Sequence, residues 1–153
     1  AVNSDITQVN NLAVGTYVVI YTATNEHGTS EVTRSVNVVI GQSNWVGPWT
    51  TSNDCNVALF SLSGTHTMAA GATANDLVIS DMFALTAELV NVTIDGQVVT
   101  VPQQTVDVTT GNIIFSGSGS MNVDGTQIVI NYDYENTTPI VGGTGSCTIT
   151  YSI

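Results

Sequence analysis

Apolar and polar residues alternate with a period of two in two neighbouring segments near the N-terminus, residues 13–24 and 31–40. A turn-forming cluster, Asn25-Glu26-His27-Gly28, lies between them. Because successive side chains of a strand point to opposite faces of a sheet, this period is typical of β-strands and excludes an amphipathic helix. The pattern therefore predicts a β-hairpin at this end of the chain.

The alternation stops between Gly41 and Gly47, where polar and glycine residues predict a domain boundary near residue 42. We expect two domains, residues 1–41 and 42–153. Short strand-like segments fill the second, and Asp95-Gly96 and Asp124-Gly125 are strong turn signals between them. The chain is thus predicted to be all-β, with a small antiparallel β-barrel or sandwich after residue 42. The expected strands are residues 47–51, 55–62, 65–71, 76–80, 86–94, 97–101, 104–109, 112–120, 126–134 and 145–152.

The charge balance excludes several classes of partner. Charged residues make up only 8% of the 153 residues, and the net charge is −11 because Arg34 is the only basic residue beside 12 acidic ones. A phosphate backbone would be repelled, so we expect no nucleic-acid binding. Docking on an anionic membrane surface is excluded for the same reason. No apolar run approaches the ~18 residues of a membrane-spanning helix.

The chain has two cysteines, Cys55 and Cys147, near the two ends of the second domain. Two cysteines and two distant histidines do not have the spacing of a zinc site, and no metal or cofactor is expected. The even number of cysteines indicates an exported protein with one disulfide, and two separate buried thiols are the alternative. A disulfide would join the first and last strand regions, as in a sheet that closes on itself, and would contribute ~4–5 kcal/mol.

No catalytic motif stands out, so the sequence predicts a protein that is not an enzyme. Asp133 and Glu135 lie on one side of an extended strand, about 7 Å apart, which is within the range of glycoside hydrolases. The short chain offers no additional segment to build a cleft around them, and solvated surface carboxylates are the preferred interpretation. The chain also has no Gly-x-Ser-x-Gly nucleophile turn.

Five aromatic residues are candidates for ligand binding, because aromatic faces stack on the apolar faces of sugar rings. The alternative is that they are core residues. Gly47-Pro48-Trp49 also has the Gly-x-Trp pattern with which small lipid-binding barrels often begin, where the tryptophan closes the barrel floor. The five candidates are Trp45, Trp49, Tyr132, Tyr134 and Tyr151.

The run GTYVVIYTATNEHG at residues 15–28, followed by RSVNVV at residues 34–39, resembles the C-terminal half of a bacterial immunoglobulin-like domain. Asn25 departs from the aspartate that is usual in that family. Residues 43–153 look like the small β domain that follows such a module in Bacteroidota surface lipoproteins. The similar features are Trp49, Cys55, the Val92–Pro102 hairpin and the Gly145–Tyr151 strand.

This resemblance implies an exported protein at the cell surface or outer membrane of a Gram-negative bacterium, with the periplasm as the alternative. A lipid anchor outside this chain would be its only link to the membrane. The expected function is a glycan-binding or glycan-uptake accessory, which requires exposed coplanar aromatic residues. The alternatives are a structural subunit of an outer-membrane complex, which requires an apolar patch or an unfinished domain, and a barrel that carries an apolar ligand.

Residues 1–41 account for only about half of an immunoglobulin-like sandwich, which has about seven strands. They provide one hairpin and a short strand expected around Ile6–Val9. A hairpin alone is marginally stable, so one of its faces should lack an opposing sheet. We therefore expect upstream strands, or strands of another chain, to complete this domain; packing on residues 43–153 is the alternative.

Overall fold

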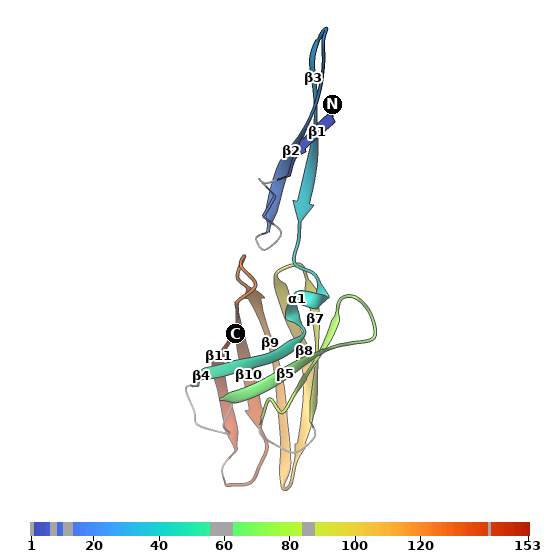
Figure 1. The fold of residues 1–153 in the computed structure, drawn as a ribbon. Coiled ribbons are helices and arrows are strands. Elements are labelled where there is room, and N and C mark those ends of the chain that lie inside the picture. The colour runs from blue at the N-terminus through green and yellow to red at the C-terminus, as the bar shows by residue number, and fades with distance from the viewer. Residues whose placement is uncertain (1, 7–8, 11–13, 56–62, 84–87, 141) are drawn as a thin grey trace. The chain divides into compact units, whose positions relative to one another are not determined.

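The computed structural model describes residues 2–6, 9–10, 14–55, 63–83, 88–140 and 142–153. The chain divides into two compact units, Ala1–Ile40 and Gly41–Ile153. The first contains a three-stranded sheet and the second a closed barrel (Figure 1), so the prediction of an all-β fold is confirmed. The choice between a barrel and a sandwich, which the strand pattern left open, is settled in favour of the barrel.

The first unit is an antiparallel sheet in the order β1-β2-β3, formed by Val2–Asp5, Gly15–Asn25 and Gly28–Val38. The predicted hairpin is β2 and β3, whose register runs without a break from Gly15 opposite Val38 to Asn25 opposite Gly28. The third strand is Val2–Asp5, whereas the sequence placed it around Ile6–Val9. Residues 7–8 of that expected segment lie outside the described residues.

The second unit begins with a short helix, α1, and continues as eight antiparallel strands that close into a barrel (Figure 1). Each strand pairs with the next along the chain, and β11 returns to pair with β4. The elements are α1 Gln42–Trp45, β4 Gly47–Cys55, β5 Gly64–Ala70, β6 Asp76–Ser80, β7 Leu89–Asp95, β8 Val98–Val108, β9 Gly111–Met121, β10 Gln127–Asn136 and β11 Gly143–Ser152.

Three features differ from the predicted strands. Helix α1 lies where only a break was expected, and Gly41 N donates a hydrogen bond to Asn44 Oδ1 (3.0 Å) at its start. The segments 97–101 and 104–109 form one strand, β8, whose register shifts between Val101 and Gln104 because an extra residue bulges there. Most of the strand predicted over 55–62 lies outside the described residues, since 56–62 are not described.

Beside the bulge, the Gln104 side chain forms hydrogen bonds to β7 in place of the missing backbone hydrogen bonds. Its Oε1 accepts a hydrogen bond from Asn91 N (2.9 Å), and its Nε2 donates one to Asn91 O (2.7 Å). An amide side chain thus provides the donor and the acceptor that a strand backbone would otherwise supply. The barrel wall stays hydrogen-bonded where the ladder between β7 and β8 stops.

The barrel interior is filled by the alternate residues of its strands. On β10, Ile128, Ile130 and Tyr132 are buried, while Asn131 and Asp133 between and beyond them are exposed. The neighbouring strand β9 has glycine at positions 117 and 119, where a Cβ atom would lie 2.3 Å and 2.0 Å from backbone oxygens of β10. Strands β9 and β10 can therefore pack this closely only with glycine at those positions.

Candidate functional site

Cys55 and Cys147 form a disulfide, as predicted, and their Cα atoms are 4.0 Å apart. The two residues lie directly opposite each other on β4 and β11, the first and last strands of the barrel. The bond therefore fixes the seam at which the barrel closes. A disulfide is compatible with an exported protein.

All five aromatic residues proposed to bind a ligand are buried, so the prediction of an exposed stacking platform is wrong. The largest exposed fraction among them is 8%, at Tyr134. Their ring faces are covered because Tyr132, Tyr134 and Tyr151 occupy inward positions of β10 and β11, and the two tryptophans lie in α1 and at the start of β4. As the alternative interpretation expected, all five are core residues, namely Trp45, Trp49, Tyr132, Tyr134 and Tyr151.

The two tryptophans hold α1 to the barrel. Trp49 Nε1 donates a hydrogen bond to Trp45 O (2.8 Å), and Trp45 Nε1 donates one to Gly96 O (3.3 Å) in the turn between β7 and β8. Gln42 Nε2 reaches the carbonyl oxygens of Thr73 (2.8 Å) and Asp76 (2.7 Å) near the start of β6. These hydrogen bonds hold α1 against one end of the barrel. At that end β6 begins and the turn connects β7 to β8.

A small polar cluster lies inside the barrel. The hydroxyl oxygens of Tyr132 and Tyr151 are 3.2 Å apart and share a hydrogen bond, and the His66 ring meets the Tyr151 ring edge-on with centroids 5.7 Å apart. Burial raises the pKa of both tyrosines above the ordinary value, so both hydroxyls keep their protons at neutral pH. The sequence indicated no role for His66, because a single histidine in a strand matches no motif.

Burial also lowers the pKa of His66 below its ordinary value of 6.5, against the opposing effect of the Asp81 and Glu88 carboxylates. The folded protein therefore holds a neutral imidazole in the pH range where the unfolded chain takes up a proton. As the pH falls through 6.5, we expect this residue to make unfolding easier, until the lower pKa of the folded state is reached.

Urea denaturation between pH 8 and pH 5 measures this effect. In the wild type, the free energy of unfolding should decrease as the pH falls below 7. Replacing His66 by phenylalanine should make this decrease smaller. The same replacement at His27, whose side chain is 83% exposed, is the matched control for the loss of a histidine outside the barrel interior. Equal slopes in the wild type and the His66→Phe variant would contradict the expectation.

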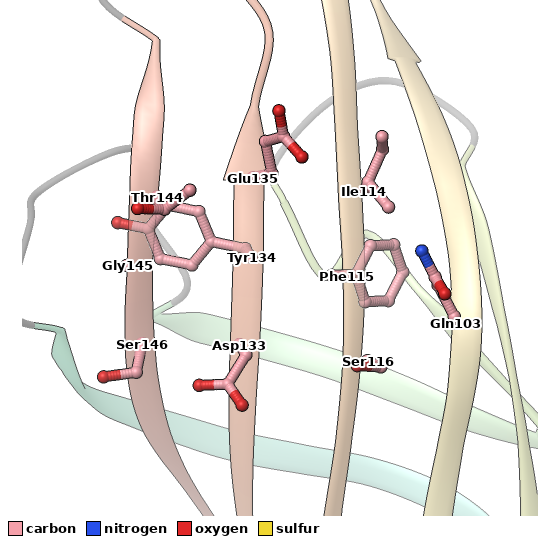
Figure 2. Close-up of a pocket in the computed structure, with 10 residues that line it drawn as sticks. All are labelled: Gln103, Ile114, Phe115, Ser116, Asp133, Tyr134, Glu135, Thr144, Gly145 and Ser146. Atoms are coloured by element: carbon pink, nitrogen blue, oxygen red, sulfur yellow. The ribbon is translucent and has the colours of Figure 1, made fainter.

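A shallow hollow of about 500 Å³ lies on the barrel wall across β8, β9, β10 and β11 (Figure 2). Its lining is mixed, with Ile114, Phe115 and Tyr134 beside the polar side chains. Asp133 and Glu135 both line it from β10, as expected for residues two apart on one strand, and Ser116 and Ser146 lie opposite Asp133 on the neighbouring strands. Residues 41–153 contain no lysine or arginine. The hollow therefore offers carboxylates and hydroxyls, the groups that bind polyhydroxylated molecules, without a basic residue beside them.

The three-stranded sheet of the first unit has one apolar face, which we call the open face. The strand register places its side chains on one side of the sheet. Val19 is buried, but Val32 is 65% and Val2 80% exposed, and no second layer of described residues covers them within this unit. The apolar residues of the open face are Val2, Tyr17, Val19, Tyr21, Val32 and Val36, and Arg34, opposite Val19, lies on the same side of the sheet.

No family model matches the chain, and no curated protein is significantly similar to it. No helix of the described residues is long and apolar enough to span a membrane. Within the same described ranges, no group of three or more His, Cys, Asp and Glu side chains is arranged to hold a metal ion. The features that can indicate a function are therefore the barrel interior, the hollow beside Asp133 and Glu135, and the open face.

Proposed function

We propose that this chain is a non-catalytic assembly module of an exported surface protein, in which the sheet of residues 1–40 joins a partner and the barrel is a separate, disulfide-linked unit. The observation that carries the proposal is the open face. A sheet needs a second layer on its apolar face to be stable in water. A sheet face on which two valines, Val2 and Val32, stay exposed is a site for another β layer.

The edge of the sheet supports the same role. Strand β3 is 11 residues long, pairs with β2 on one side only among the described residues, and has no bulge in its register. Proteins usually protect such edges with lysine, proline or a bulge. Gly28–Val38 has no lysine, proline or bulge, and two charged side chains, Glu31 and Arg34, are its only protection of this kind. The backbone edge of β3 can therefore still accept a further strand.

Placement at the cell surface or outer membrane of a Gram-negative bacterium, through a lipid anchor outside this chain, belongs to the proposal and follows from the resemblance to immunoglobulin-like modules of surface lipoproteins. The disulfide supports export. Glycan binding is the second candidate function, and the hollow beside Asp133 and Glu135 favours it. Binding there would depend on hydrogen bonds to hydroxyl groups, and a glycan array of the intact protein tests it.

Site-specific photocrosslinking tests the assembly role. A photoreactive residue at position 32, on the open face, should crosslink to one partner in envelopes of the native cells. The matched control is position 98, a valine that is 53% exposed on barrel strand β8. We expect Val32→Lys to reduce partner association at least about tenfold, because it places a charge in an apolar contact, and Val98→Lys to leave it unchanged.

Two results would contradict the assembly role. One is a crosslink pattern that is the same from positions 32 and 98. The other is a Val32→Lys variant that associates as the wild type does. Sedimentation velocity of the purified chain, with and without Val32→Lys, shows whether a second copy of this chain is the partner.

A further inference from the structure

His66 is a buried polar residue that lacks a hydrogen-bond partner in the structure. Its side chain is 1% exposed, and neither Nδ1 nor Nε2 has a partner. Buried polar atoms almost always have one, since leaving a donor or acceptor unbonded in the interior is costly. Two such atoms on one ring indicate that a hydrogen-bonding group belongs beside it.

The surroundings of His66 combine aromatic surface with spare hydrogen-bonding capacity. Tyr151 contacts the imidazole, and Trp49 lies opposite His66 in the strand register. The single hydrogen bond between the hydroxyls of Tyr132 and Tyr151 uses one of their two protons. The second hydroxyl proton and several lone pairs remain for a further partner.

Two side chains from outside the strands also occupy this interior. Met82 and Phe83 lie in the connection between β6 and β7 and are 0% and 5% exposed. The Phe83 ring packs edge-on against Phe115 of β9, with centroids 4.9 Å apart, and Phe83 N donates a hydrogen bond to Glu88 Oε1 (2.8 Å). Neither residue belongs to a strand, so neither takes part in the hydrogen-bonded ladders of the barrel wall.

We propose that the barrel interior binds one small apolar molecule with a single uncharged head group, such as a hydroxyl, and that His66 receives this head group. The interior of an eight-stranded barrel holds either its own side chains or one small ligand, so the molecule would take the place of the Phe83 side chain. A hydroxyl fits a neutral imidazole, which accepts a hydrogen bond at one nitrogen and donates one at the other. A carboxylate fits poorly, since residues 41–153 contain no lysine or arginine to neutralise it. This binding site is additional to the proposed assembly role.

Nuclear magnetic resonance of the full chain, with ¹⁵N-labelled histidine, tests the site directly. Octan-1-ol is the probe, and octanoate, which has the same apolar body and a charged head, is the control. We expect octan-1-ol to shift the imidazole nitrogen signals of His66 saturably and to bind at least about tenfold more tightly than octanoate. His27, the only other histidine, is exposed and serves as the internal reference.

Two variants distinguish binding at His66 from a general effect of core packing on affinity. His66→Phe should weaken octan-1-ol binding about tenfold by removing the polar contact, and Phe83→Ala should strengthen it by making room. Octane, measured in the same way, should be insensitive to His66→Phe. If a variant does not fold, the comparison of octan-1-ol with octanoate on the wild type still tests whether the site prefers an uncharged head group.

Three results would overturn the proposal. The first is the absence of a saturable shift of the His66 signals with octan-1-ol. The second is equal affinity for octan-1-ol and octanoate. The third is a long-lived internal water that bonds the His66 nitrogens and stays in place when the alcohol is added, because the missing partner would then be solvent.

Discussion

Replacing both Cys55 and Cys147 by serine is expected to lower the free energy of unfolding by about 4 kcal/mol. The two residues are 92 positions apart, so their bond closes a long loop and removes much conformational freedom from the unfolded chain. The bond also joins β4 to β11, the only pair of neighbouring barrel strands that are far apart in the chain. For a unit of the size of Gly41–Ile153, the loss corresponds to a fall in melting temperature of about 15 °C.

Thermal unfolding followed by circular dichroism measures this effect. A reducing agent should lower the melting temperature of the wild type to that of the double variant and leave the double variant unchanged. The double replacement is preferable to a single one because it leaves no free thiol to form other disulfides. A melting temperature within 2 °C of the wild type would contradict the role of this bond in closing the barrel.

Local signals in the sequence predicted much of the barrel correctly. The Asp95-Gly96 signal correctly marks the turn between β7 and β8, where Asp95 ends β7 and Gly96 begins the turn, and Asp76–Ser80 forms a strand with the predicted bounds. The gap between the predicted strands 97–101 and 104–109 coincides with the bulge at Pro102, which has no amide hydrogen to donate to the ladder. In these cases short-range backbone preferences agree with the final fold.

The functional residues were harder to predict because their roles depend on closure of the barrel. Alternation on β10 placed Tyr132 and Tyr134 on one face and Asp133 on the other, and the structure has them so. Which face points inward is decided by β11 returning to β4, a contact that no local pattern contains. The same closure buries His66 beside Tyr151, although the two residues are 85 positions apart in the chain.

Helix α1 shows another limit of reading a sequence locally. Four residues are too few for a helical period, so Gln42–Trp45 looked like a break. What stabilises the helix comes from distant positions, namely the carbonyl oxygens of Thr73, Asp76 and Gly96. The Gly-x-Trp pattern at Gly47-Pro48-Trp49 pointed to a closing role for its tryptophan, and the buried position of Trp49 agrees with that role.

Replacing Trp49 by alanine is therefore expected to destabilise the barrel by about 3–5 kcal/mol. Trp49 is 3% exposed, so truncation removes a large buried ring and leaves a cavity. It also removes the hydrogen bond from Nε1 to Trp45 O, which holds α1 to the start of β4. Urea denaturation followed by circular dichroism measures the change, and the fluorescence of Trp45, the remaining tryptophan, reports the release of the helix.

Trp49→Phe is the matched control for this prediction. Phenylalanine keeps much of the buried ring but cannot donate the hydrogen bond, so it should cost about 1–2 kcal/mol. The difference between the two variants then measures how much of the stability comes from filling the barrel end rather than from the bond to Trp45. If Trp49→Ala changed the free energy of unfolding by less than about 1 kcal/mol, the side chain would not be closing the barrel. The Gly-x-Trp pattern would then have no structural role in this chain.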